Sequence, residues 1–192
     1  MSDSSKATKA GSKRQETSFT RWLIETALLV LLAFALAFGI RTLVVEPFIV
    51  PTGSMIPTIQ INNRVLAEKI TFRFVRGPQY GDIVVFPDPK GEHPHLIKRV
   101  IATGGQTVDL RNGKVFVDGR QLDEPYTHGQ PSEQLTPEIS FPFKVPADSV
   151  WLMGDNRTNS GDSRVFGAVA VKDIQGHAVW TYWPLSAFGA LK

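Results

Sequence analysis

An uninterrupted apolar segment near the N-terminus is the feature that most constrains how this chain folds. Residues 22–40 (WLIETALLVLLAFALAFGI) carry a single charged side chain, Glu25. At ~1.5 Å per residue, a helix of this length spans roughly 28 Å, close to the thickness of a bilayer's hydrocarbon core. Because Glu25 lies one turn inside the first end of the segment, its carboxylate can reach the interface and avoid the costly midplane. The segment predicts a transmembrane helix.

Two other interpretations of this segment compete. A helix that is apolar on all faces can be buried in a protein core, although this is uncommon in so small a domain. The segment can also be a secretory signal that is cleaved, because AFA (33–35) and ALA (35–37) imitate small-residue cleavage sites. These alanines lie inside the apolar run and not after it, so we favour a retained membrane anchor.

Charge is distributed unevenly along the chain. Residues 1–21 contain five Lys/Arg and two Asp/Glu, and the remainder contains 16 of each kind, the totals being 21 and 18. The segment 1–21 is rich in Ser, Thr, Lys and Gly, which predicts a disordered basic tail. Short basic flanks of a membrane span stay in the cytoplasm, so we expect the tail inside and the chain after residue 41 outside. Because the basic excess is confined to the tail, no nucleic-acid partner is expected.

Residues 41–192 have the pattern of an antiparallel β protein. Short β-prone runs alternate with turn residues, and Asn112-Gly113 between two of them is a strong hairpin signal. Residues 123–146 contain five prolines and little periodicity, which indicates a loop-rich insertion. The predicted fold is mainly β: a coiled antiparallel β-sheet body with a small loop-rich lobe, preceded by one N-terminal transmembrane helix. The expected strands cover residues 65–70, 83–86, 96–102, 107–110, 115–117, 120–122, 150–153, 168–171 and 177–183.

A serine lies in a rigid turn shortly after the apolar segment. Residues 51–58 (PTGSMIPT) place Ser54 between Gly53 and Met55, bracketed by prolines. A catalytic nucleophile needs such an immobilised turn, but an ordinary Pro/Gly/Ser loop has the same composition. The spacing alone favours the ordinary loop.

Lys98 lies in an apolar strand, residues 96–101 (LIKRVI). Because side chains alternate along a strand, Lys98 shares a face with Leu96 and Val100. An inward lysine loses hydration, which lowers its pKa, and a shift from ~10.4 to about 8 corresponds to roughly 3 kcal/mol. Such an amine can take a proton from a serine hydroxyl. Taken alone, the strand fits better with a lysine on an edge strand whose ammonium reaches solvent.

Residues 154–164 (GDNRTNSGDSR) contain too many small polar side chains for a core strand, which predicts a tightly hydrogen-bonded loop. Cation binding through Asp155, Asn156 and Asp162 is one interpretation, but the alternating oxygen ligands and the closing Glu of an EF-hand loop are absent. Charged pairs, Asp162 with Arg164 or Asp155 with Arg157, are the favoured interpretation. Because the chain has no cysteine, a thiol nucleophile and a Cys-ligated metal are excluded. We expect no other metal and no cofactor.

Together these segments resemble the bacterial type I signal peptidases, the membrane-bound serine proteases with a Ser–Lys dyad. Residues 51–58 match the nucleophile motif, and residues 81–86 (GDIVVF) match a structural strand motif. Residues 97–100 (IKRV) match the general-base motif, and residues 154–164 match the GDNRxNSxDSR signature. Each motif is short, but the four in this order, at this distance from an apolar segment, are very specific.

The resemblance implies roles for individual residues. Ser54 is expected to be the nucleophile and Lys98 the general base. The Thr52 hydroxyl and the Ser54 backbone N–H are expected to form the oxyanion hole. Ser160 is expected to hydrogen-bond the lysine amine, with support from Asp162 and Arg164. The pockets for small substrate side chains are expected from Phe48, Val50, Ile59, Leu96 and Ile97.

The resemblance also implies an activity: removal of signal peptides from secretory preproteins by a single-pass enzyme of the cell membrane, which contacts the lipid bilayer and uses no cofactor. The alternative from another class is a catalytically silent membrane-anchored β-domain that only binds partners. A histidine-based hydrolase is disfavoured, because none of the four histidines lies in a triad motif. They are His93, His95, His128 and His177.

Overall fold

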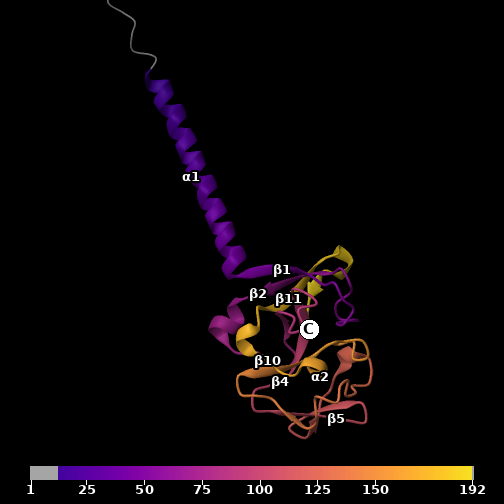
Figure 1. Ribbon diagram of the computed structural model, residues 1–192. Helices are drawn as coiled ribbons and strands as arrows, with labels where there is room; N and C mark the ends of the chain where they lie inside the picture. The colour runs from indigo at the N-terminus through magenta and orange to yellow at the C-terminus, as the bar shows by residue number, and fades with distance from the viewer. Residues whose placement is uncertain (1–12, 192) are drawn as a thin grey trace, which may run out of the picture. The chain divides into compact units, whose positions relative to one another are not determined.

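The computed structural model describes residues 13–191, which divide into a helical unit and a β body that begins at Leu43. The helical unit is one helix, α1 (Lys13–Leu43), coloured indigo in Figure 1. It contains the expected span 22–40 and also residues 13–21, which the sequence analysis assigned to the tail. Lys, Arg, Gln and Glu at 13–16 are good helix formers, so the helix continues through them. Residues 1–12 of the predicted tail lie outside the described residues.

The apolar part of α1 is long enough to cross a membrane. It covers Phe19–Leu43, 25 residues of high mean hydropathy. Leu28 and Phe38, which are 60% and 71% exposed, are among its large apolar side chains. Glu25, the one charged residue within 22–40, accepts a hydrogen bond of 2.9 Å from Arg21 Nε one turn earlier. This pairing is typical of i,i+4 side chains on a helix.

The larger sheet of the body is antiparallel and has the order β1-β2-β11-β3-β4-β9-β10, with β12 paired to β11. The consecutive GDIVVF and IKRV segments form adjacent strands, since Val84 pairs with Lys98. The strands are β1 (Val45–Ile49), β2 (Arg64–Glu68), β3 (Ile83–Phe86), β4 (Leu96–Thr103), β9 (Ser149–Met153), β10 (Val169–Ala170), β11 (Gly176–Trp183) and β12 (Gly189–Ala190).

This sheet is strongly curled. The edge strand β1 and the strand β4 are separated by three strands in the pairing order, yet Phe48 of β1 and Ile97 of β4 belong to one buried cluster. A flat sheet would hold two such strands about 19 Å apart, at about 4.8 Å per step. The curl therefore brings the turn that follows β1 against the middle of β4. The coiled antiparallel body expected from the sequence is confirmed.

A smaller sheet with the order β7-β6-β5-β8 packs on one end of the larger one. The hairpin between β5 and β6 turns at Asn112 and Gly113, whose φ angles of 51° and 73° suit the expected two-residue turn. Trp151 of β9 packs in the same cluster as Val108 and Val115 of this hairpin. The strands are β5 (Thr107–Arg111), β6 (Lys114–Val117), β7 (Arg120–Gln121) and β8 (Phe143–Lys144).

Several short elements differ from the sequence expectations. β1 was not among the expected strands; it contains Pro47, which an edge strand tolerates. The expected strand 65–70 ends at Glu68, whose carboxylate accepts the N–H groups of Ile70 and Thr71 and starts a π-helical turn. Residues 123–146 hold only η2 and β8. The short helices are η1 (Thr71–Val75), η2 (Pro125–Thr127), α2 (Ser163–Phe166), η3 (Val171–Asp173) and η4 (Leu185–Ala187).

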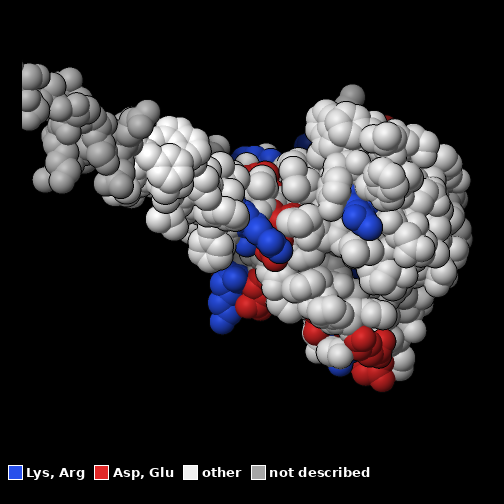
Figure 2. Space-filling model, turned by 90° about the horizontal axis from the view of Figure 1, so that it is seen from above, with Lys and Arg blue, Asp and Glu red and all other residues white. Residues whose placement is uncertain are grey.

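The charged side chains of the body are mixed in sign. On the face shown in Figure 2, Lys/Arg and Asp/Glu side chains lie in small groups between larger areas of uncharged surface. This distribution agrees with the equal numbers of acidic and basic residues after residue 21.

Candidate active site

The curl of the sheet brings Ser54 and Lys98 together. Lys98 Nζ lies 2.6 Å from Ser54 Oγ, although the residues are 44 positions apart in the sequence. β4 is paired on both sides, with β3 and with β9, so Lys98 is not on a sheet edge. Only 1% of Lys98 and 7% of Ser54 are exposed. The structure therefore excludes a lysine whose ammonium reaches solvent from an edge strand.

Burial determines the protonation of Lys98. Loss of hydration lowers the pKa of this amine from 10.5 to about 8, and the negative charges of Asp162, Asp88 and Asp155 oppose the shift only in part. A lysine with this pKa has a substantial neutral fraction near neutral to mildly alkaline pH. The neutral amine has a lone pair that can accept the Ser54 hydroxyl proton across the 2.6 Å contact.

The loop of residues 154–164 holds the serine turn in place. The backbone N–H of Asn156 donates to the Ser54 carbonyl at 3.0 Å, and Asn156 Nδ2 donates to the Gly53 carbonyl at 2.9 Å. On the other side of the serine, Thr52 Oγ1 lies 3.4 Å from Ser54 Oγ. The nucleophile candidate is thus fixed by backbone contacts, and a second hydroxyl group lies beside it.

Gly154 is required by the close approach of this loop to the serine turn. A Cβ at this position would lie 2.4 Å from the Ser54 carbonyl oxygen and 2.3 Å from Ser160 Oγ. Neither distance is tolerated by real side chains, and the first partner is backbone that cannot move aside without moving Ser54.

Buried ion pairs stabilise the loop, and one of the two expected pairs is wrong. Asp162 pairs with Arg164 at 2.8 Å, as predicted, and also accepts the Gly154 N–H at 3.1 Å. Asp155 does not pair with Arg157 as expected. It accepts two hydrogen bonds from Arg99, at 2.8 and 2.7 Å, because the buried Arg99 on β4 needs a counter-charge within reach.

Arg157 instead pairs with Glu124 of the loop-rich lobe, so an ion pair connects the loop 154–164 to that lobe. Since guanidinium groups already occupy Asp155 and Asp162, the cation interpretation of this loop is wrong. Among the residues described here, no cluster of three His, Asp or Glu side chains is arranged to hold a metal ion.

The hydrogen bond expected between Ser160 and Lys98 is not present. Ser160 is buried, at 8% exposed, and its Oγ has no hydrogen-bond partner within the described part of the chain. Ser160 lies beside the serine turn, since a Cβ on Gly154 would be 2.3 Å from Ser160 Oγ and 2.4 Å from the Ser54 carbonyl oxygen. The serine is therefore next to the site without a bond to the amine.

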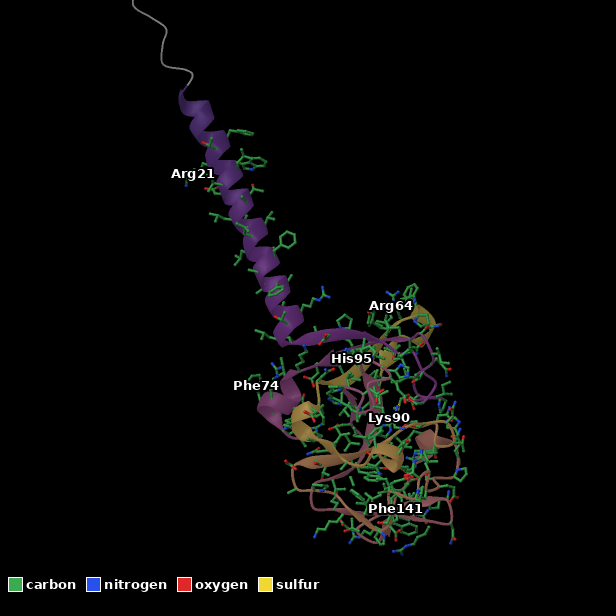
Figure 3. The ribbon with its side chains drawn as sticks, viewed as in Figure 1. Arg21, Arg64, Phe74, Lys90, His95 and Phe141 are labelled. Atoms are coloured by element: carbon green, nitrogen blue, oxygen red, sulfur yellow. The ribbon has the colours of Figure 1, made fainter. Side chains whose placement is uncertain are left out.

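Two hollows meet at Ser54. The first is small and apolar, and the residues that line it are Phe48, Ile49, Val50, Pro51, Thr52, Ser54, His95, Leu96 and Ile97. Four of the five residues expected to bind substrate therefore line it, whereas Ile59 is fully buried in the core beneath. His95, which is labelled in Figure 3, packs edge-on against Phe48 with ring centroids 5.1 Å apart and was not expected here.

The second hollow is a cleft of about 290 Å³ that is lined by both Ser54 and Lys98. Charged side chains of the β3–β4 loop line it, among them Asp88, Lys90 and Glu92. The Asp88 carboxylate accepts three backbone N–H groups of its own loop, which fixes the loop and lowers the pKa of Asp88 despite partial burial. Ser54 thus stands between an apolar pocket and a polar cleft.

Comparison with known proteins identifies the family. A family model described as signal peptidase, peptidase S26 matches residues 23–183. The chain belongs to this signal peptidase family. The family expected from the four motifs is confirmed.

The relatives cover most of this signal peptidase chain. It is 42% identical to a signal peptidase I of Leptolyngbya laminosa over 167 residues, which are 83% of this chain and 79% of the relative. It is 38% identical to a probable signal peptidase I-2 of Synechocystis over 185 residues, which are 94% and 82% of the two chains. A crystal structure of a signal peptidase I from Enterococcus faecalis is 30% identical with a TM-score of 0.46, covering 53% of this chain and 97% of that chain.

The sequence analysis did not identify three residues that hold the loop 154–164 of this signal peptidase in place. Arg99 and Thr58 contact Asp155 of the loop, and Tyr126 contacts Arg99. Arg99 is 2% exposed, and Tyr126 from the lobe lies over its guanidinium at 4.0 Å from the ring centroid. Thr58 donates to the same Asp155 carboxylate at 2.5 Å. The available signal was the arginine in an otherwise apolar strand, since a buried guanidinium requires acidic partners from elsewhere in the fold.

Proposed function

We propose that this chain is a signal peptidase I: a membrane-anchored serine endopeptidase that removes N-terminal signal peptides from secretory preproteins. The contact of 2.6 Å between Lys98 Nζ and Ser54 Oγ carries the proposal. Membership of the signal peptidase family and the names of the relatives, which are signal peptidases I, support the same reaction. A silent binding domain would have no use for a buried amine paired to a hydroxyl group.

The proposed reaction proceeds in two acyl transfers. Neutral Lys98 accepts the Ser54 proton as Oγ bonds to the carbonyl carbon of the signal's last residue, giving a tetrahedral oxyanion. The Thr52 hydroxyl and the Ser54 N–H donate to this oxyanion, one such donor being worth about 2.7–4 kcal/mol. The C–N bond then breaks, and the Lys98 ammonium gives its proton to the leaving amine of the mature protein.

Deacylation repeats these steps with water. Lys98, neutral again, takes a proton from a water molecule whose oxygen attacks the ester carbonyl. The C–O bond to Ser54 breaks, the serine regains a proton from Lys98, and the signal peptide leaves with a free carboxylate. Contacts from Asn156 to the carbonyl groups of Gly53 and Ser54 hold the serine turn in place during both acyl transfers.

The two hollows suggest how the substrate lies. Small side chains before the cleaved bond occupy the apolar pocket beside Phe48 and Leu96, where a large side chain would not fit. Residues after the bond run through the polar cleft beside Asp88 and Lys90. The basic residues before the apolar segment 22–40 favour a cytoplasmic N-terminus and a β body outside the cytoplasm.

The test is cleavage of a preprotein by the purified full chain in detergent. Ser54→Ala and Lys98→Met are expected to lose at least about 10³-fold in kcat/KM, because each removes a member of the dyad. The matched controls are Ser186→Ala and Lys114→Met, which change the same residue types at exposed positions. Unchanged cleavage by Ser54→Ala or Lys98→Met would overturn the proposal, and the silent binding domain would take its place.

A further inference from the structure

The turn η1 exposes two large apolar side chains. Phe74 is 79% exposed and Val75 is 72% exposed, and Figure 3 shows Phe74 on this turn at the edge of the β body. Neighbouring Ile70 is also partly exposed, at 38%. Side chains of this size gain about 1.5–3 kcal/mol each on full burial, so a surface that presents them together indicates an apolar environment in use.

The exposure is built into the fold, since η1 is fixed at both ends. Glu68 accepts the N–H groups of Ile70 and Thr71, at 2.8 and 2.9 Å, before the turn. Arg76 donates two hydrogen bonds to Asp82, at 2.6 and 2.9 Å, after it. In the middle, Phe72 points inward against His177 with ring centroids 5.2 Å apart. Phe74 and Val75 therefore cannot fold back onto the body without breaking these contacts.

A basic hollow of about 250 Å³ lies beside the exposed pair. Lys69, Arg73 and Lys172 line it, and none of the described residues that line it is acidic. Lys69 also pairs with Glu46 at 2.8 Å, and Glu46 and Asp173 line an adjoining hollow. Together the basic hollow and the adjoining hollow are lined by three Lys/Arg side chains and two Asp/Glu side chains. The hollow has an apolar rim and a positive interior.

The chain's own connectivity indicates what this surface meets. Lys69 N–H donates to the Val44 carbonyl at 2.8 Å, and Val44 is the residue that joins α1 to β1. The turn η1 therefore starts beside the point where the chain leaves its apolar helix. If α1 spans a bilayer, Lys69, which lies two residues before η1, is hydrogen-bonded to the residue that follows the bilayer segment.

We propose that this surface, formed by η1 with Lys69, Arg73 and Lys172, binds the headgroup of an acidic phospholipid. The phosphate and its net negative charge occupy the basic hollow, and Phe74 and Val75 enter the interfacial layer beside it. A basic side chain near an acidic membrane surface contributes about a fivefold preference. The inference goes beyond peptide cleavage and depends only on α1 lying in a membrane.

The test uses the full chain in lipid nanodiscs. The protein has no cysteine, so Val75→Cys allows a single environment-sensitive fluorophore to be attached at the turn. We expect its emission to shift to shorter wavelength as phosphatidylglycerol replaces phosphatidylcholine. The matched control is the same label at Leu135→Cys, an exposed apolar position in the loop-rich lobe, where no such shift is expected. Cleavage of a preprotein by each labelled chain verifies separately that it is folded.

Charge variants distinguish binding of a lipid headgroup in the basic hollow from attraction of basic side chains elsewhere on the body to an acidic membrane. Arg73→Gln with Lys172→Gln is expected to lose the lipid-dependent shift, since two basic side chains together contribute on the order of 25-fold. Arg120→Gln with Lys144→Gln removes the same charge from the smaller sheet and is expected to keep it. Equal emission in both lipids, or a shift that survives the first double variant, overturns the proposal. A shift abolished by millimolar inorganic phosphate would instead indicate a site for free anions.

Discussion

At the scale of single residues, burial of Lys98 makes its amine reactive and at the same time lowers the free energy of unfolding. Burial lowers the pKa of this amine from 10.5 to about 8, and the same loss of hydration destabilises the folded protein whenever the amine is charged. The hydrogen bond to Ser54 offsets only part of this cost, since such bonds contribute about 1 kcal/mol net. Residues that serve a reaction and not the fold commonly show this conflict.

Replacement of Lys98 by methionine tests this conflict. The folded pKa lies below the unfolded one, so the penalty is full below about pH 8 and disappears as the pH rises to 10.5. At pH 7, Lys98→Met is expected to be more stable than the natural chain by about 2–3 kcal/mol, after loss of the hydrogen bond. Urea unfolding in detergent at pH 7 and pH 10 measures this, with a smaller gain at pH 10. A variant that is less stable at pH 7 contradicts the account.

At the scale of elements, the serine turn and the loop 154–164 act as one unit. Neither the proline-bracketed turn nor the polar loop is rigid by composition alone, and it is the Asn156 contacts that join them. Arg99 extends the unit into the sheet by holding Asp155, to which Thr58 of the serine turn also donates. The nucleophile is therefore positioned by a loop about 100 residues later in the sequence.

Gly154→Ala is the sharpest test of this unit. The added methyl group would lie 2.4 Å from the Ser54 carbonyl oxygen, so the turn must shift. We expect about 1–3 kcal/mol of lost stability and a fall of roughly 10²-fold in kcat. Gly189→Ala is the matched control, because a Cβ there meets open space. Normal turnover by Gly154→Ala in a preprotein cleavage assay would show that the close approach does not position Ser54.

Local patterns predicted the elements better than they predicted the contacts between elements. The Asn112-Gly113 hairpin and the inward face of Lys98 follow from turn chemistry and strand alternation, and both occur. The partner of Asp155 could not be predicted in this way, because Arg99 reaches it only through the pairing of β4 with β9, in which Arg99 lies opposite Met153. Pro47 concealed β1 for a similar reason, since only the sheet order shows that β1 is an edge.

At the scale of the whole molecule, chain length ties the site to the membrane helix. Ser54 lies 11 residues after Leu43, the last residue of α1, and an extended segment of that length spans at most roughly 40 Å. The nucleophile candidate is thus tethered near one end of the apolar helix. A substrate whose cleavage site emerges beside the same membrane needs no long excursion to reach it.

The pH dependence of kcat/KM for preprotein cleavage by the full chain in lipid nanodiscs tests the central claim most directly. Only neutral Lys98 can accept the Ser54 proton, so the rate should rise tenfold per pH unit in acid and level off around a midpoint near pH 8. Lys114→Met, at an exposed position, should leave this profile unchanged. A profile that is flat from pH 5 to pH 10, or one whose midpoint lies near 10.5, would contradict a buried Lys98 as the general base.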